Sequence, residues 1–299
     1  MSHALISQFE NLKTWAGGGH RAPHKPLLVL LALGEWARGN RELRFTEVVE
    51  PLTDLLQRFG PPRKVHHPEY PFWRLQRDGV WEVHAVQHIA VGADGGATKK
   101  SLVEGGATGR FPMSVQAALT ARPLLVNEIA QLLLNAHFPT SVHEDILNAV
   151  GLETDTQSAT GVGRDPNFRK RVLTAYQHQC AICGMQLLLS GSTVALEAAH
   201  IKWHQAGGPP LVSNGLSLCV LHHKLFDRGA FAIHPSRTVY ISDEIAGLAS
   251  LNEHLLSFHG KPLRNPIRTE DMPAESFTAW HRREVFRGQP RPRSSPVPR

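Results

Sequence analysis

The order of apolar and polar positions predicts helices in the first part of the chain. Residues 26–38 are almost continuously apolar and are followed by Gly39, which is typical of a buried helix. Thr46 is placed to cap a second helix that runs to about residue 56, although Pro51 would lie inside it. Buried helices must pack against other elements, and the next segment is predicted to form some of them.

That segment has the composition of β-structure. Residues 72–75 and 80–84 are rich in aromatic and β-branched side chains and are joined through Asp78-Gly79, which predicts a β-hairpin. Residues 92–109 are rich in Gly, Ala, Thr and Lys and predict a long mobile loop. Together with the helices, these elements predict an α+β domain.

A polar, glycine-rich stretch then divides the chain. Pro123 opens a predicted helix to about residue 136, and a capping box at 141–144 begins another, which Gly151 closes. Residues 152–164 predict a linker between a first domain, 1–151, and a second, 165–286. Asp165 and Pro166 favour a helix that runs to Gln177.

The C-terminal residues 287–299 predict a disordered basic tail. From Arg282 onward the chain has six arginines, four prolines and a single glutamate. The tail is either a solvated end or a loose clamp on phosphates, and the sequence leaves both open.

Composition narrows the class of protein. No apolar stretch of about 20 residues is present, so no membrane span is expected, and the absence of a secretory signal favours the cytoplasm. The net charge of +6 suits a polyanionic partner, although many basic proteins bind none. Three cysteines in a chain of 299 residues argue against a disulfide framework.

The cysteines have the spacing of a zinc site instead. Two short pairs of soft ligands are what tetrahedral zinc requires, and a helix would place the second pair on one face. All four positions would be filled by protein, which indicates a structural ion rather than a catalytic one. The alternative is that these residues are small buried thiols. The ligands would be Cys180, Cys183, Cys219 and His222.

Between and beside these pairs lie residues suited to phosphodiester hydrolysis. His200 lies in the segment Leu-Glu-Ala-Ala-His-Ile, Asn214 precedes Gly215, and His223 directly follows His222. Successive helix residues point about 100° apart, so His222 can face zinc while His223 faces away, toward His200. Neutral imidazole can take a proton from water near pH 7, and Mg²⁺ or Mn²⁺ suits phosphate oxygens.

At these residues the sequence resembles the HNH, or ββα-metal, nuclease family. The resemblance runs from about residue 164 to 286 and includes the tight turn Cys-Ala-Ile-Cys-Gly at 180–184, called here the knuckle. It also includes Ala-His-Ile, Asn-Gly and His-His-Lys-Leu-Phe-Asp. It implies a zinc-braced nuclease domain with His200 as general base. It also implies that Asn214 holds the loop and the His200 ring, and that His223 binds one catalytic divalent metal.

One position departs from that family. Many members carry Asp or His directly before the general base as a second metal ligand, whereas this chain has Ala199. Glu197 is the candidate replacement, or else a purely structural residue. Asp227, four residues after His223, is the alternative ligand. His204 is expected to be a surface or phosphate-contacting residue.

The first half is similar to the sulfur-binding domain of phosphorothioate-dependent restriction endonucleases. The resemblance covers roughly residues 5–150 and rests on three segments. It implies an apolar cup of Tyr70 and Pro71 for the sulfur; Arg74 departs from the small residue that relatives carry nearby. Phosphate contacts are implied for Arg21, Lys99 and Lys100, and base-edge contacts for His20 or one of the loop residues. The three segments are His20-Arg21-Ala22-Pro23-His24-Lys25-Pro26, His66-His67-Pro68-Glu69-Tyr70-Pro71-Phe72-Trp73 and Lys99-Lys100.

Sulfur differs from oxygen in a way that such a cup can use. It is larger, softer and less strongly hydrated, so an apolar surface that accepts sulfur leaves a phosphate oxygen poorly solvated. Without the resemblance, Tyr70-Pro71-Phe72 would be an ordinary packed strand entry, and Lys99-Lys100 a solvated pair of charges.

The sequence therefore predicts a modification-dependent restriction endonuclease with two α+β domains. Its partner would be double-stranded, phosphorothioated DNA. Because one HNH site cuts one strand, a homodimer on DNA is expected. Two alternatives remain open: a nuclease that recognises another mark, such as a methylated base, and a zinc-braced DNA-binding protein without activity.

Overall fold

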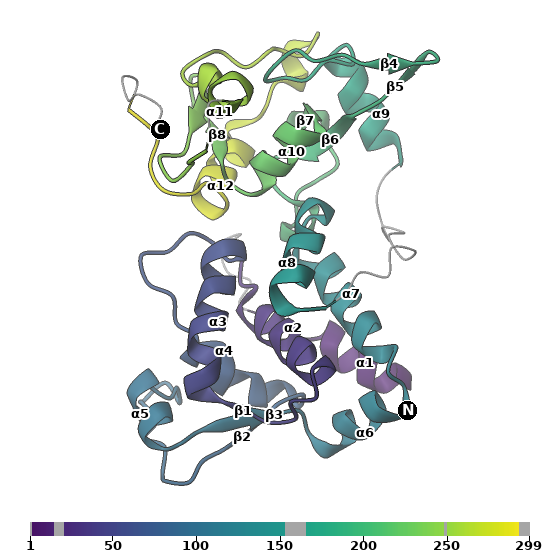
Figure 1. Cartoon of the computed structure of the whole chain (residues 1–299). Coiled ribbons are helices and arrows are strands. Elements are labelled where there is room, and N and C mark those ends of the chain that lie inside the picture. The colour runs from purple at the N-terminus through teal and green to yellow at the C-terminus, as the bar shows by residue number, and fades with distance from the viewer. Residues whose placement is uncertain (1, 15–20, 153–165, 248–249, 293–299) are drawn as a thin grey trace. The chain divides into compact units, whose positions relative to one another are not determined.

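A computed structural model describes residues 2–14, 21–152, 166–247 and 250–292. It divides into two compact units on either side of residues 153–165 (Figure 1). The predicted linker, apart from its first residue, lies outside the described residues, as do Asp165 and the last seven residues of the tail. Leu152, predicted as the first linker residue, is buried in the core of the first unit. Among the described residues, none of the helices has both the length and the apolar character needed to cross a membrane.

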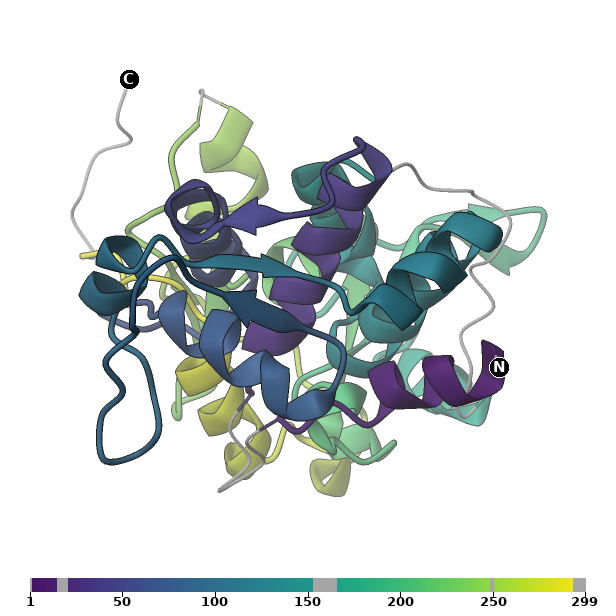
Figure 2. The same cartoon turned by 90° about the horizontal axis from the view of Figure 1, so that it is seen from below.

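The first unit is mainly helical with a small antiparallel sheet of order β1-β3-β2. Both views show α2 between α3 and α7 (Figures 1 and 2). Its elements are α1 (Ser2–Glu10), α2 (His24–Ala37), β1 (Leu43–Arg44), α3 (Phe45–Phe59), α4 (Glu69–Arg74), β2 (Glu82–His84), α5 (Lys99–Glu104), β3 (Thr108–Arg110), α6 (Met113–Ala121), α7 (Leu125–His137) and α8 (His143–Val150).

The apolar run at 26–38 does form the predicted buried helix. Residues 26–34 of α2 are all buried, and Gly39, at φ 96°, follows the helix end. The second helix, α3, is longer than expected. It begins at Phe45 rather than after a Thr46 cap and accommodates Pro51 at an exposed position.

The predicted hairpin between 72–75 and 80–84 is wrong. Residues 69–74 form α4, and a short 3₁₀ turn, Leu75–Asp78, follows it. Phe72 and Leu75 are fully buried, at the i, i+3 spacing that puts both on one helical face. Asp78 does not form a hairpin turn but accepts a hydrogen bond from Lys25 at 2.5 Å. Strand β2 pairs with β3 instead.

The stretch 92–109 is also more ordered than its composition indicates. Thr98 and Ser101 form a capping box that begins α5, and Leu102 of this helix is fully buried. Gly109 lies in β3, where a Cβ atom would come within 2.2 Å of the Trp81 ring. The glycine is therefore needed for aromatic packing rather than for a mobile loop. Helix α8 begins at His143 with Val142 as its N-cap residue rather than Ser141, and Gly151 ends that helix in the left-handed conformation, as predicted.

The second unit is built on an antiparallel strand pair followed by a helix, which is the ββα arrangement expected. Strands β6 and β7 pair from Leu196↔Cys219 to His200↔Gly215, and α10 follows directly. Helix α9 packs against both strands. The elements are α9 (Pro166–Ala175), β4 (Leu188–Leu189), β5 (Ser192–Thr193), β6 (Leu196–His200), β7 (Gly215–Cys219), α10 (Val220–Asp227), β8 (Phe231–Ile233), β9 (Val239–Ile241), α11 (Ser250–His254) and α12 (Glu275–Glu284).

Part of the predicted disordered tail is ordered. The backbone amide of Asp243 donates to the carbonyl of Gln289 at 2.9 Å, and Arg291 donates from its amide to the carbonyl of Ile241 at 2.8 Å. The described residues 287–292 therefore extend the second unit past β9. Helix α9 also ends two residues earlier than predicted, because Gln177 and His178 have positive φ angles of 53° and 55°.

Candidate functional site

Four side chains of the second unit converge as a metal site. The ligand atoms of Cys180, Cys183, Cys219 and His222 all lie within 4.8 Å of one another. A tetrahedral zinc ion with bonds of about 2.3 Å to sulfur and about 2.0 Å to nitrogen places its ligand atoms roughly 3.5–4 Å apart. The donor set and its spacing therefore fit zinc, as the sequence predicts.

Local structure explains why these four residues meet. Gly184 adopts φ +74°, and its amide donates to the carbonyl of Cys180 at 2.8 Å, which closes the knuckle. Cys219 ends β7 and is the N-cap residue of α10, so His222 lies one turn away. His222 Nε2 lies 3.0 Å from the backbone carbonyl of His254, a contact that orients Nδ1 toward the sulfurs of Cys219 and Cys180, at 3.1 and 3.7 Å.

The two adjacent histidines of α10 do diverge. His223 Nδ1 lies 2.6 Å from Glu197 Oε2, and Nε2 lies 3.1 Å from Asp227 Oδ2. Burial alone would lower the pKa of His223, but the charge of Asp227 and the hydrogen bonds to both carboxylates outweigh it and raise the pKa to about 10. His223 and Glu197 thus lie close enough together to serve as a pair of metal donors outside the cysteine cluster.

Strand alternation explains how Glu197 reaches this position. Side chains two residues apart in a strand point to the same face, so Glu197 and Ala199 lie on one face of β6. Glu197 therefore places its carboxylate on the same face as Ala199, two residues before it. The side chain of Glu197 is 49% exposed, whereas Ala199 is fully buried. One divalent ion holds its donor atoms about 3 Å apart, close to the observed Nδ1–Oε2 separation. These two residues would therefore be able to hold a hard divalent ion.

His200 ends β6 on the opposite face of the strand. Its ring stacks on Phe168 with a centroid separation of 4.0 Å, and the His204 ring lies 6.2 Å away. Its strand partner is Gly215, where a Cβ atom would come within 2.5 Å of Val172 and 3.1 Å of Phe168. The glycine therefore allows α9 to pack closely enough for Phe168 to support the His200 ring.

Asn214 is fully buried and secures the loop that follows His200. Its Oδ1 accepts from the amide of Lys202 at 2.8 Å, and its Nδ2 donates to the carbonyls of Lys202 and Pro209 at 3.0 and 2.9 Å. The same loop needs Gly208, because a Cβ atom there would lie 1.8 Å from the Lys202 carbonyl oxygen. The hydrogen bonds of Asn214 thus go to the loop backbone.

In the first unit, Arg21 and His66, from two separate segments of the chain, come together around His24. Burial first, and then the positive charges of His66, Arg63 and Arg21, lower the pKa of His24 to about 4. The structure therefore brings basic groups from separate segments of the chain close to His24. Arg63 was missed by the sequence analysis, since an isolated arginine carries no local pattern.

The residues predicted to bind DNA occupy different environments. Tyr70 is 42% exposed, whereas Pro71 is buried. Arg21 is only 7% exposed and donates to the carbonyl of Phe59 at 2.7 Å, so protein engages at least part of its guanidinium. The remaining three are Lys99 and Lys100, both exposed in the first turn of α5, and His20, which lies outside the described residues.

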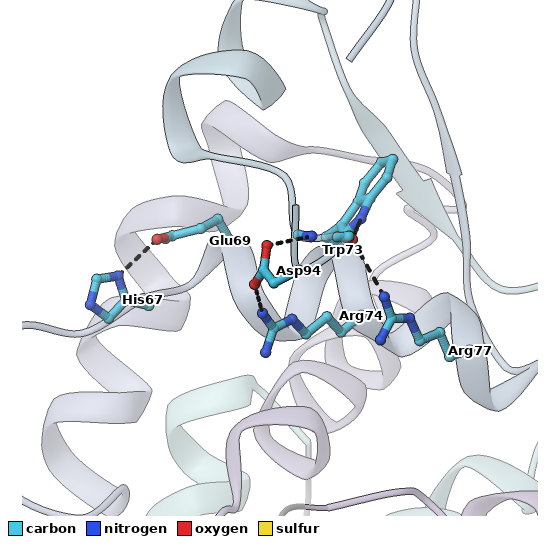
Figure 3. Close-up of polar contacts among 8 residues, drawn as sticks. His67, Glu69, Trp73, Arg74, Arg77 and Asp94 are labelled. Carbon is cyan, nitrogen blue, oxygen red and sulfur yellow. Dashed lines mark hydrogen bonds and ion pairs between the residues drawn. The ribbon is translucent and has the colours of Figure 1, made fainter. Parts of the chain in front are cut away.

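Arg74 has a defined place beside Tyr70. Its guanidinium carbon lies 4.9 Å from the centre of the Tyr70 ring, and the His67 ring stacks on Tyr70 at 4.6 Å. Figure 3 shows Asp94 directed at Arg74, with which it forms an ion pair at 2.5 Å. The amide of Gly96 and the charge of Arg74 hold the pKa of Asp94 below its usual value. The exposed aromatic ring is therefore bordered by a cation whose partner comes from a neighbouring loop.

That loop is fixed to α4 by further contacts. The indole nitrogen of Trp73 donates to the carbonyl of Gly95 at 2.9 Å, and Arg77 reaches the same oxygen at 3.4 Å (Figure 3). Asp94 Oδ1 accepts from the amide of Gly96 at 3.0 Å. The segment 92–96 is thus held as a tight turn against α4, and Asp94 is a residue of this surface that sequence reasoning missed.

Comparison with known proteins gives two family matches. Residues 2–155, more than half of the chain, match the family model of the ScoMcrA-like DNA sulfur-binding domain. Residues 180–234 match the HNH endonuclease model, and this stretch contains the zinc ligands, His200, Asn214 and His223. A search of curated proteins found no match.

The solved structures that match part of this chain include two sulfur-binding domains and one restriction endonuclease. The sulfur-binding domain of ScoMcrA complexed with phosphorothioated DNA has 22% identity and a TM-score of 0.43, covering 49% of this chain and 94% of that one. The corresponding SprMcrA complex has 22% identity and a TM-score of 0.43, covering 51% and 94%. The modification-dependent TagI restriction endonuclease has 24% identity and a TM-score of 0.30, covering 45% and 41%.

Proposed function

Because this chain belongs to the family of the ScoMcrA-like DNA sulfur-binding domain and also carries an HNH endonuclease domain, we propose that it cuts DNA in response to phosphorothioation. It is a DNA-cleaving hydrolase of the modification-dependent restriction class. The proposal is that it recognises phosphorothioated duplex DNA and hydrolyses nearby phosphodiester bonds with a histidine base and one divalent metal. The observation that carries it is the presence of both domains in one chain.

In the nuclease domain, each residue of the HNH motif has a distinct task. His200, supported by Phe168, takes the proton from the attacking water. Asn214 holds the loop after His200. His223 and Glu197 would hold the divalent ion, which supplies positive charge to the developing phosphorane and the leaving oxygen when it is bound. Zinc at the cysteine cluster would brace β7 and α10.

In the recognition domain, the exposed face of Tyr70 is the proposed contact for sulfur. An aromatic surface accepts a weakly hydrated sulfur, but it leaves a phosphate oxygen without a hydrogen-bond donor, at a cost of about 1–3 kcal/mol. Arg74 borders this ring and supplies charge to the adjacent backbone, and Lys99 and Lys100 are exposed for further phosphate contacts. Arg21 and His20 remain predicted contacts.

The decisive experiment compares cleavage of two duplexes that differ only by one phosphorothioate in each strand, with Mg²⁺ or Mn²⁺. We expect cutting near the sulfur in the modified duplex and little in the other. His200→Ala should abolish cutting while leaving binding to sulfur-modified DNA intact. Equal cutting of both duplexes would refute the sulfur requirement.

Cleavage of both strands requires either two protomers or two successive encounters, since each chain carries one HNH site. We propose a homodimer on DNA. Sedimentation of the protein with and without modified duplex tests this directly. A one-to-one complex that still makes double-strand breaks in a single encounter would contradict it.

A further inference from the structure

A buried carboxylate lies behind His223, on the side away from Glu197. Asp227 Oδ2 is 3.1 Å from His223 Nε2, and Asp227 Oδ1 accepts from the indole nitrogen of Trp203 at 3.1 Å. The Asp227 side chain is 1% exposed. Both of its oxygens are therefore directed at nitrogen donors inside the protein.

The direction of these hydrogen bonds follows from chemistry. An indole N–H can only donate, so Trp203 fixes one carboxylate oxygen as an acceptor. An ionised carboxylate has no proton to give, so His223 Nε2 carries the hydrogen of the second bond. The other ring nitrogen, Nδ1, is thereby left directed at Glu197, 2.6 Å away.

Trp203, which donates to Asp227, is itself packed against the C-terminal helix α12. The Trp203 ring packs edge-to-face on Trp280 of α12 with centroids 6.0 Å apart, and both rings are 3% exposed. Helix α12 is held in turn by His281, which stacks on Phe226 of α10 at 3.7 Å. The HNH match ends at residue 234, so this brace comes from a segment beyond it.

We infer that Asp227 is a positioning residue which, held by Trp203, fixes the His223 ring with Nδ1 directed at Glu197 and toward a divalent ion. This deepens the proposed function and rests on it for the metal. This role differs from that of a metal ligand, which is the alternative for Asp227. A buried carboxylate whose two oxygens both accept hydrogen bonds is not accessible to a hydrated metal ion. Mutation of a carboxylate that hydrogen-bonds a metal-ligating histidine commonly lowers metal affinity or activity by about 10–100-fold.

The test is Asp227→Asn, because asparagine keeps the shape but can donate to Nε2 and force the hydrogen onto Nδ1. With ¹⁵N-labelled histidine and a His223→Gln variant for assignment, the hydrogen on each ring nitrogen of His223 is measured by NMR in protein saturated with Mg²⁺, a diamagnetic ion that would occupy Nδ1 and leave the hydrogen on Nε2. We expect loss of the Nε2–H form in Asp227→Asn. Trp203→Phe removes the indole donor together with part of the ring that packs on Trp280, and it should reduce the Nε2–H form of His223 to a smaller extent than Asp227→Asn. Glu270→Gln, which neutralises an exposed carboxylate of the same unit, is the matched control.

The second readout is Mn²⁺ affinity by electron paramagnetic resonance. We expect about 10–100-fold weaker binding in Asp227→Asn with unchanged zinc content, and rescue of cleavage by excess Mn²⁺. If Asp227→Asn fails to fold, Trp203→Phe provides both readouts. An unchanged tautomer and unchanged Mn²⁺ affinity in a folded variant would overturn the inference. Failure of the wild-type protein to cut modified DNA would instead refute the proposed function, since the tautomer is measured without DNA or cleavage.

Discussion

Asn214 and Lys202 are joined by two hydrogen bonds between the side-chain amide of one and the backbone of the other. The Lys202 amide donates to Asn214 Oδ1 at 2.8 Å, and Asn214 Nδ2 donates to the Lys202 carbonyl at 3.0 Å. Lys202 lies two residues after His200, so this pair ties the predicted general base to the start of β7.

Asn214→Ala should therefore reduce cleavage by about 100-fold, because small displacements of a catalytic group cost rates of this order. It should also lower stability by about 1–3 kcal/mol, since the buried backbone groups lose their partners. Single-turnover rates and urea unfolding measure the two effects. Ser213→Ala is the control, because Ser213 holds Ala274 through its backbone. Unchanged cleavage by a folded Asn214→Ala protein would contradict the role.

Removing zinc should unfold the second unit but spare the first. The cysteine cluster joins the knuckle to β7 and α10, and structural zinc sites contribute folding energy directly. Cys180→Ser should lose zinc and cleavage while retaining binding to modified DNA. Metal analysis, thermal unfolding and gel shift measure these properties. Full cleavage by zinc-free protein would be incompatible with this prediction.

Tyr70→Ala should reduce the preference for sulfur-modified DNA. Loss of the exposed ring removes the apolar contact, so the ratio of the two dissociation constants should fall by about tenfold. Tyr70→Phe keeps the ring and should keep the preference. Fluorescence anisotropy with modified and unmodified duplexes gives both constants. The same ratio in Tyr70→Ala and the wild type would rule out this surface as the sulfur contact.

Asp94→Asn should tighten binding to modified and unmodified DNA alike. The change releases Arg74 from its ion pair and removes a negative charge from the proposed DNA surface. The slope of log affinity against log salt should steepen by about one unit if Arg74 then contacts a phosphate. Asp54→Asn, which releases Arg58 on α3, is the matched control. Weaker binding would instead mean that Asp94 holds Arg74 in its DNA-binding position.

The first unit should lose stability in mild acid. The pKa of His24 is about 4 in the folded chain, against an ordinary value of 6.5, and that of His137 is also about 4. The unfolded chain binds the proton more tightly than the folded chain. The contribution of these histidines to the free energy of unfolding is therefore fully present above about pH 6.5 and is lost as the pH drops toward 4. Hydrogen exchange of α2 amides across this range measures it. His24→Gln should flatten the slope, whereas His88→Gln, at an exposed position, should not.

Some features of the second domain followed from local spacing. The zinc ligands are two short pairs, and their order around Ala-His-Ile and Asn-Gly defines the ββα unit before any fold is known. Likewise, the apolar run at 26–38 and Gly39 were sufficient to predict α2. Composition was misleading for α4 and α5, because aromatic residues can face a core from a helix, and a glycine-rich stretch can contain a capped turn.

The sequence by itself determined the ligand set, the nuclease motif and the two-domain order, since each depends on residues close together in the chain or on a fixed series of motifs. Only the tertiary structure decided which groups meet across long separations. The contacts of Glu197 with His223, of Trp203 with Asp227, and of Asp94 with Arg74 join separate segments. Such contacts depend on how strands and helices pack, which residue spacing along the chain does not encode.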